Sequence, residues 1–271
     1  MSNLAKKPPV TPDVWSSLRR TTPARIALGR AGGSLPTRAW LEFKSAHAAA
    51  RDAVHNPFDA EQIAAEIAEF GTRVVVVATA ARDRLTFLQR PDLGRRLDDP
   101  SRYELQQAAQ PDAPPDLAIV VSDGLSALAV HRQAPPLLAA LLPQLIGDDW
   151  NLAPIVVARF GRVALQDEVG HVLGARLSLT LIGERPGLGS PDSLGAYMVY
   201  APRTGNTDAN RNCVSNIRPE GLPLEAAAET LYYLLTEARR RRLSGVQLKD
   251  ERKMDKESAP RVATRVQTRL P

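Results

Sequence analysis

Residues 177–193 read Leu-Ser-Leu-Thr-Leu-Ile-Gly-Glu-Arg-Pro-Gly-Leu-Gly-Ser-Pro-Asp-Ser. The first six have the length and apolar content of a strand, and the run ends abruptly at Gly183 in a loop with three glycines. Glycine lets a ligand approach the backbone closely, whereas Pro186 fixes one torsion and removes one hydrogen-bond donor. Taken alone, this loop predicts a surface turn and a ligand-binding loop about equally well.

Other apolar runs extend this pattern along the chain. The predicted strands are residues 73–78, 116–121, 153–157 and 177–182. Continuous β-branched and apolar runs of this kind fit strands that are buried on both faces of a parallel sheet. The predicted helices between and after them are residues 135–146, with proline in the first turn, 166–174, and 225–242, capped by Gly245. Alternating strands and helices predict an α/β fold with a doubly wound, mostly parallel, Rossmann-like sheet.

The N-terminal part has a different character. Thr37 can cap a helix over residues 38–54, and Asp59 with Gln62 has the spacing of a reciprocal capping box. The predicted organisation is a disordered N-terminus at 1–13, a smaller helical N-terminal region at 14–71, a Rossmann-like domain at 72–248 and a disordered basic tail at 249–271.

Composition limits the classes of function. The net charge is +5, but residues 239–271 hold eleven Lys/Arg and four Asp/Glu, which is +7, so the remainder is 5 − 7 = −2. We therefore expect no nucleic-acid-binding surface on the body of the protein. The sequence has no apolar run of about 20 residues and no secretory signal, so we expect no membrane span. A single cysteine, Cys213, fits a reducing, cytoplasmic setting, and composition alone favours a small buried apolar role for it.

Polar loops follow three of the predicted strands. They are residues 122–126, 158–163 and 183–187. In a parallel sheet these loops share the carboxyl edge, where ligands bind, and this raises the odds of a ligand site to roughly three to one. Asp123 fits a helix N-cap as well as a ligand contact, and an acid–base pair of Asp123 with Glu184 stays open. Neither G-x-G-x-x-G nor a Walker sequence occurs, which disfavours a nucleotide phosphate site, and His131 and His171 lack a hydrolase triad context.

Six motifs occur in the order seen in one known family. They are Arg19–Arg30, Arg90–Leu97, Val121–Ser126, Gly161–Val163, Gly183–Gly189 and Arg211–Ile217. Over residues 13–248 the chain thereby resembles the small subunit of ethanolamine ammonia-lyase. The resemblance implies an adenosylcobalamin-dependent enzyme that converts ethanolamine to acetaldehyde and ammonia. It also implies a large barrel subunit that holds the substrate, while the small subunit covers the cobalamin from the other side.

The resemblance further implies three cobalamin-binding positions, Val163, Glu184 and Cys213, within the domain at 72–248. Neighbouring loop residues extend this predicted cofactor site with Ser122, Asp123, Gly124, Arg162, Gly183, Arg185 and Pro186. Cobalamin proteins that supply a histidine to cobalt use Asp-x-His-x-x-Gly, but here Val169 precedes His171 in place of the aspartate. Without that aspartate to orient the imidazole, we expect the cofactor to keep its own base on cobalt.

Two alternatives compete with this interpretation. One is a non-catalytic Rossmann-type module that binds a small molecule or acts as a scaffold. The other is a protein that binds polyanions through its basic tail. The expected partner is the large subunit in a hetero-oligomer, and the expected location is cytoplasmic, with a bacterial microcompartment as the alternative that some relatives suggest.

Overall fold

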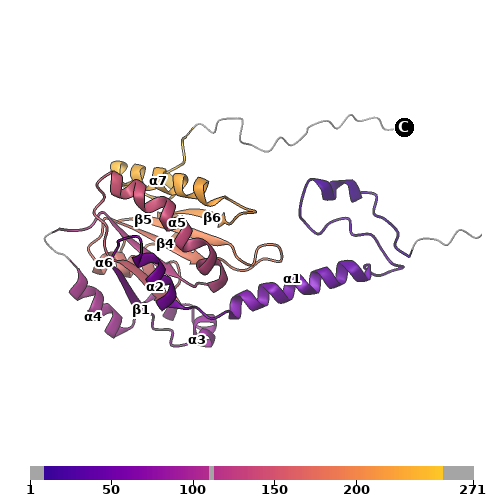
Figure 1. Ribbon diagram of the computed structural model, residues 1–271, viewed down its shortest axis with the longest axis horizontal. Helices are drawn as coiled ribbons and strands as arrows, with labels where there is room; N and C mark the ends of the chain where they lie inside the picture. The colour runs from indigo at the N-terminus through magenta and orange to yellow at the C-terminus, as the bar shows by residue number, and fades with distance from the viewer. Residues whose placement is uncertain (1–8, 110–112, 253–271) are drawn as a thin grey trace, which may run out of the picture. The chain divides into compact units, whose positions relative to one another are not determined.

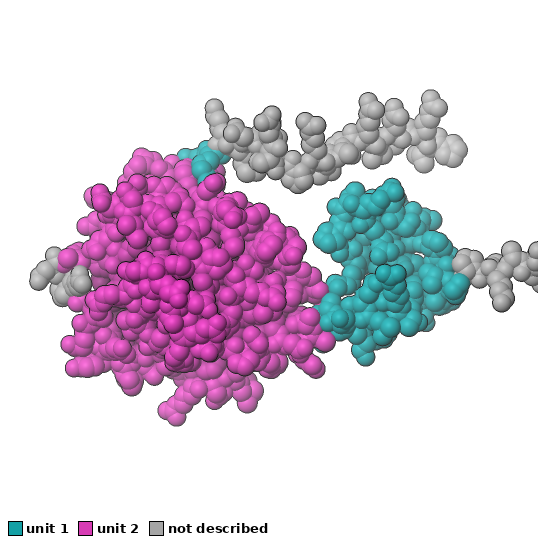
Figure 2. Space-filling view, viewed as in Figure 1, with its two compact units in different colours: residues 1–47, 251–271 teal, residues 48–250 magenta. Residues whose placement is uncertain are grey.

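The computed structural model describes residues 9–109 and 113–252 (Figure 1). It divides into two compact units, Met1–His47 with Glu251–Pro271, and Ala48–Asp250 (Figure 2). The predicted disorder of the N-terminus and of the basic tail falls largely on residues 1–8 and 253–271, which lie outside the described residues. The candidate site belongs to the second unit.

The described residues form seven α-helices and one six-stranded sheet. The α-helices are α1 (Thr37–His55), α2 (Ala60–Ala68), α3 (Arg84–Gln89), α4 (Asp99–Ala108), α5 (Ala127–Gly147), α6 (Leu165–Val172) and α7 (Leu224–Arg241). The strands are β1 (Val74–Ala78), β2 (Leu117–Ser122), β3 (Ile155–Arg159), β4 (Leu177–Gly183), β5 (Leu194–Tyr200) and β6 (Arg211–Ile217). Short 3-10 helices are η1 (Ser16–Arg20), η2 (Leu93–Arg95), η3 (Asp208–Asn210) and η4 (Gly245–Gln247).

The strand order is β1-β3-β2-β4-β5-β6. The first four of these strands are parallel, whereas β5 runs antiparallel to both β4 and β6. The mixed α/β class and the mostly parallel sheet are confirmed, but the antiparallel strands β5 and β6 were not predicted, and a Rossmann-like classification is not established. Ser122 pairs with both Ala158 and Ile182, and Gly183 pairs with Leu194, so the ends of β2, β3 and β4 and the start of β5 lie along one edge.

Helices cover both faces of the sheet. On one face α2, α5 and α7 pack in a core with Ile119 and Val121 of β2, and Figure 1 shows α5 and α7 side by side there. On the other face α4 and α6 pack in a core with Ala118 and Val120. Alternate residues of one strand enter opposite cores because successive side chains point to opposite faces.

Helix α5 begins at Ala127, so the predicted start at residue 135 is wrong. Ser126 caps it by accepting a hydrogen bond from the backbone N of Ala129 at 3.2 Å, and Pro135, Pro136 and Pro143 lie inside the helix. An interior proline costs about 3 kcal/mol. The turns before Pro135 bury five residues, Ala127, Ala129, Val130, Gln133 and Ala134, and this burial offsets that cost.

The caps of α2 and α7 differ in part from expectation. The Asp59 cap is present, because its carboxylate accepts from the backbone N of Gln62 at 2.9 Å, but the Gln62 side chain donates to Glu66 instead of closing a capping box. Ile63 of α2 is fully buried in the core of the sheet, and α2 lies within the second unit. At the other end, α7 is capped by Arg242 at φ 57° rather than by Gly245.

Candidate functional site

A hollow of about 380 Å³ opens at the carboxyl edge of the sheet. Its lining comes from the ends of β2 and β4, from the loop after β3 and from β5, and consists of Gly124, Leu125, Arg162, Val163, Ile182, Gly183, Glu184, Arg185 and Tyr197. A second hollow of about 500 Å³ shares Arg162, Val163 and Tyr197 with the first. We call these the β4 hollow and the η3 hollow. We call the three shared residues, Arg162, Val163 and Tyr197, the ridge between the hollows, and Val163 is its aliphatic member.

Glu184 ties three strands together at this edge. Its carboxylate accepts hydrogen bonds from Ser193 Oγ and Ser215 Oγ, both at 2.6 Å, and from the backbone N of Asn216 at 3.2 Å. Residues 215–216 form a bulge in β6, since Leu194 pairs with Ile217 but Ala196 pairs with Val214. Bulges re-aim side chains, and this one turns two donors toward the carboxylate. A carboxylate has about four lone-pair sites, so Glu184 keeps capacity for a further donor.

Cys213 joins this group through Tyr197. The two residues are directly paired across β5 and β6, so their side chains are neighbours on one face of the sheet. Cys213 is exposed, so the expectation of a buried apolar role is wrong. Desolvation of the thiol still raises the pKa of Cys213, the Tyr197 hydrogen bond lowers it, and the Glu184 charge raises it. Burial, with the Cys213 and Glu184 neighbours, likewise raises the pKa of Tyr197.

Ser122 and Asp123 lie beneath the hollows and not in their lining. Both are 1% exposed. Ser122 Oγ accepts from the backbone N of Gly161 at 2.9 Å, and Asp123 accepts from the backbone N of Phe160 at 2.7 Å and pairs with Arg84 at 2.9 Å. Burial raises the pKa of Asp123 to about 6, against the opposing effect of Arg84. The two side chains therefore link the end of β2 to the loop after β3 by hydrogen bonds.

The geometry of Asp123 does not fit two of the roles that its sequence position left open, the helix N-cap and the acid–base pair, and its ligand contact stays a prediction. The N-cap of α5 is Ser126, and the Asp123 carboxylate is directed at Arg84 and Phe160 rather than at Glu184. Among the described residues no hydrogen bond joins Asp123 to Glu184, so the geometry does not favour an acid–base pair.

Close backbone contact explains two of the glycines. Gly124 has φ +52°, and a Cβ there would lie 2.5 Å from the carbonyl oxygen of Gly183. A Cβ on Gly183 would lie 2.1 Å from the carbonyl oxygen of Ser126. The loop after β2 thus packs directly on the end of β4, with Leu125 N donating to Gly183 O at 2.9 Å. These two glycines therefore bring backbone into the lining of the β4 hollow.

Arg162 is held from below by Phe87 of α3. Its guanidinium lies 3.9 Å from the centre of the phenyl ring, and Nη2 donates to the Phe87 carbonyl at 2.8 Å. Burial, followed by the positive charges of Arg84 and Arg95, lowers the pKa of Arg162. Arg185 is exposed at the mouth of the β4 hollow, whereas Pro186 stands beside it without lining either hollow.

The predicted site residues separate into two groups. Val163 and Glu184 line one hollow, and Cys213 contacts the tyrosine that lines it, so segments 50 residues apart in the chain meet at one edge. Gly124, Arg162, Gly183 and Arg185 line the same hollow. Tyr197 and Phe87 were not predicted. Tyr197 lies on an unpredicted strand, and the orientation of Phe87 depends on packing that a single sequence does not reveal.

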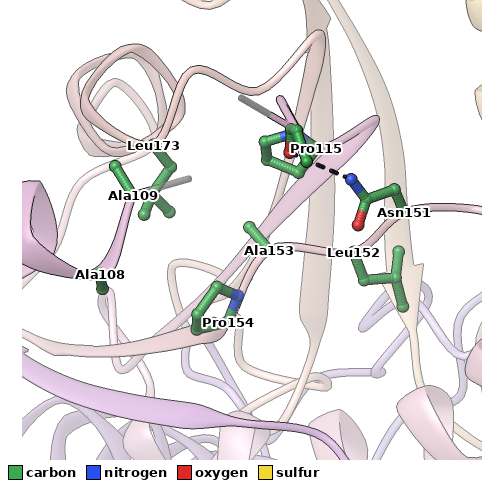
Figure 3. Close-up of a pocket in the computed structure, with 9 residues that line it drawn as sticks. Ala108, Ala109, Pro115, Asn151, Leu152, Ala153, Pro154 and Leu173 are labelled. Atoms are coloured by element: carbon green, nitrogen blue, oxygen red, sulfur yellow. Dashed lines mark hydrogen bonds between the residues drawn. The ribbon is translucent and has the colours of Figure 1, made fainter. Parts of the chain in front are cut away.

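A smaller cavity, of about 20 Å³, lies at the opposite edge of the sheet, near the starts of β2 and β3. Figure 3 shows its lining of alanines, leucines and prolines beside Asn151. The Asn151 amide donates to the Ala113 carbonyl at 3.2 Å. That volume holds about one water molecule, so this cavity is not a candidate for a cofactor.

Two other features are absent from the described part of the chain. None of its helices is both long and apolar enough to cross a membrane. None of its His, Cys, Asp and Glu side chains gather in threes that could hold a metal ion.

Comparison with known proteins identifies close relatives. The family model described as ethanolamine ammonia-lyase light chain (EutC) matches residues 12–249. The chain is 57% identical over 249 residues to a protein of Azotobacter vinelandii (strain DJ / ATCC BAA-1303), covering 92% of each chain. It is 58% identical over 242 residues to one of Ralstonia nicotianae (strain ATCC BAA-1114 / GMI1000), covering 89% of this chain and 90% of that one. Both relatives are named ethanolamine ammonia-lyase small subunit.

Proposed function

This chain belongs to the family of ethanolamine ammonia-lyase small subunits, and from that membership we propose that it holds adenosylcobalamin at an interface with a large catalytic subunit. The complex converts ethanolamine to acetaldehyde and ammonia. The carrying observation is that Val163, Glu184 and the Cys213–Tyr197 pair, which are distant in sequence, gather around one hollow at the carboxyl edge of the sheet.

The chemistry of the lining fits this cofactor. Cobalamin carries neutral amide side arms, one phosphodiester and an apolar macrocycle edge. Backbone groups of Gly124 and Gly183 and the spare lone pair of Glu184 suit amide arms, and Val163 suits the macrocycle edge. Both hollows are open to solvent along the carboxyl edge of the sheet. A cofactor held there would need a second subunit to cover its other side.

The residues of this chain bind and orient rather than react. Bound adenosylcobalamin supplies the radical chemistry, and the protein supplies position and exclusion of water. Glu184 accepts from an amide or hydroxyl of the cofactor while three donors of the protein fix its own orientation. The Cys213 thiol and Tyr197 hydroxyl provide neutral polar contacts beside it.

Titration of the co-expressed complex with adenosylcobalamin tests this proposal. We expect a saturable change in the visible spectrum of the cofactor, and ethanolamine turnover that requires both subunits. Glu184→Ala should weaken binding, whereas Glu229→Ala, an exposed carboxylate on α7 outside both hollows, should not. Vigorous turnover by the lone chain, or a complex indifferent to adenosylcobalamin, would contradict the proposal.

A further inference from the structure

Three arginines surround the hollows without a carboxylate partner. Arg162 lines both hollows, Arg185 lines the β4 hollow and Arg95 lines the η3 hollow. In the part of the chain that the structure describes, none of the three forms an ion pair with a carboxylate within 4 Å. Other arginines near this edge do: Arg84 pairs with Asp123, and Arg211 pairs with Asp167 and Asp208.

The negative charges nearby are already engaged. Asp123 is buried against Arg84, and Asp167 is buried against Arg211. Of the residues that the structure describes, Glu184 is the one carboxylate in the lining of the β4 hollow, and its hydrogen bonds come from neutral hydroxyl and backbone donors. The lining of the β4 hollow carries two positive charges, Arg162 and Arg185, and one negative charge, Glu184, so its formal charge is +1. Arg95 adds a positive charge in the η3 hollow, on the other side of the ridge.

Arg162 is arranged in advance for an anion. Stacking on Phe87 and the hydrogen bond to its carbonyl fix the plane of the guanidinium, and the backbone N of Arg162 donates to Gly94 O at 2.7 Å. Its Nε is buried and, among the described residues, has no hydrogen-bond partner. A buried N–H without a partner is costly, and a planar guanidinium with free donors suits phosphate oxygens.

We propose that Arg162, with Arg185 and Arg95 flanking it, binds the phosphodiester of the cofactor, and that Phe87 is the positioning residue for Arg162. This inference rests on the proposed function and deepens it. The phosphodiester is the single anionic group in the nucleotide arm of cobalamin, so it complements the positive lining, whereas neutral amide arms would not relieve the repulsion among the arginines.

Paired corrinoids test the assignment without measuring turnover. Adenosylcobinamide phosphate and adenosylcobinamide share the macrocycle and amide arms but differ in the phosphate. We expect the complex with the large subunit to bind the phosphate form at least about tenfold more tightly, as charge-assisted hydrogen bonds allow. Arg162→Gln combined with Arg185→Gln should reduce this advantage to about twofold, because the affinity for the phosphate form falls by a larger factor than the affinity for adenosylcobinamide.

Further variants separate the roles. Phe87→Leu keeps the backbone carbonyl but removes the ring, so it should lose part of the phosphate advantage while the affinity for adenosylcobinamide is retained. Arg185→Gln alone, at an exposed residue, guards against misfolding of the Arg162 variant. Arg73→Gln is the matched control, because Arg73 is exposed at the start of β1, at the opposite edge.

The outcomes are distinct. A phosphate advantage that persists in Arg162→Gln/Arg185→Gln, or equal affinity of the unmodified complex for both corrinoids, would overturn the assignment while leaving the proposed function intact. Failure of the unmodified complex to bind either corrinoid would remove the proposed function and this inference with it. Loss of subunit assembly in Arg185→Gln would assign these arginines to an acidic surface of the large subunit instead, and would also overturn the assignment.

Discussion

Ser215 on β6 donates a 2.6 Å hydrogen bond to Glu184 at the end of β4, and so links two strands that lie on opposite sides of β5. The contact exists because residues 215–216 bulge out of the β5–β6 ladder, with Asn216 at φ 59°. The orientation of Glu184 is therefore set by a strand that begins 27 residues after it.

Removing that hydroxyl should weaken cofactor binding. Ser215→Ala should raise the Kd of the complex for adenosylcobalamin about two- to tenfold, because a net hydrogen bond contributes about 0.5–1.5 kcal/mol. Optical titration measures the effect, and Ser45→Ala, at an exposed residue of α1, is the matched control. In a double-mutant cycle, Ser215→Ala should add little to Glu184→Ala. Additive effects of the two substitutions would show that the serine acts independently of the carboxylate.

Cys213 offers a direct reporter of cofactor occupancy. Desolvation beside Tyr197 raises the pKa of the thiol, so its alkylation by iodoacetamide at pH 8 should be slower than that of a free cysteine peptide and should accelerate as the pH rises. At adenosylcobalamin 100 times above Kd, modification should slow by about a hundredfold, in proportion to the free fraction. Peptide mass spectrometry follows the residue, which is the single cysteine of the chain. Equal rates with and without cofactor would place Cys213 outside the bound cofactor.

Asp123 should make stability depend on pH with an unusual sign. Burial raises the pKa of Asp123 from 3.8 to about 6, so between about pH 4 and pH 6 the folded chain binds more protons than the unfolded chain. The Asp123 contribution to the free energy of unfolding therefore falls as the pH rises through that window, by about 3 kcal/mol. We expect this fall in the free energy of unfolding of the unmodified protein minus that of Asp123→Asn, both measured by urea unfolding across this pH range.

The control for Asp123 has the opposite sign. Asp92 is exposed, and its hydrogen bond with Arg90 lowers the pKa of its carboxyl. The corresponding difference for Asp92→Asn should therefore rise with pH from the acid side. Asp123→Asn also leaves Arg84 without its carboxylate partner. Because that loss changes the free energy of unfolding at every pH, the test is the slope of the difference against pH and not its absolute value. Parallel pH profiles for the protein and Asp123→Asn would contradict a raised pKa.

The sequence predicts the parallel half of the sheet better than the antiparallel half. Strands β1 to β4 are continuous apolar runs, and β4 lies within one residue of its predicted end. The missed strand β6 buries Arg211, Val214 and Ile217, so it lacks the alternation that identifies a strand. The bulge at residues 215–216 accounts for the second of these two intervals of three. In α5 the prolines predicted a helix start at residue 135. The helix begins at Ala127 instead, because the turns before Pro135 are buried in the core.

The site was predictable in position but not in side-chain direction. The rule that polar loops gather at the carboxyl edge placed Val163 and Glu184 correctly beside one another. The inward turn of Asp123 depends on Arg84, 39 residues before it, and the orientation of Arg162 depends on Phe87, 75 residues before it. Neither partner carries a local signal, because such contacts arise from the packing of α3 against the loops.

Gly183 should be among the least replaceable residues of the site. A Cβ there would lie 2.1 Å from the carbonyl oxygen of Ser126 and 2.5 Å from that of Asp123, and both atoms belong to backbone that cannot rotate away. Gly183→Ala should therefore cost about 1–3 kcal/mol or more of stability, as overpacking does, and widen the gap between β4 and the loop after β2. Gly189→Ala is the matched control, since a Cβ at Gly189 meets no atom within 4 Å.

Urea unfolding of the two glycine variants measures the stability term, and titration with adenosylcobalamin measures the site. Gly183→Ala should lose both stability and affinity, because the loop after β2, which packs on Gly183, supplies Gly124 and Leu125 to the lining of the β4 hollow. Gly189→Ala should change the free energy of unfolding by less than about 0.5 kcal/mol. If both variants unfolded at the same urea concentration, the close approach of Gly183 to Ser126 would not be a constraint on the folded chain. Unchanged affinity in a destabilised Gly183→Ala would instead exclude the loop after β2 from the cofactor site.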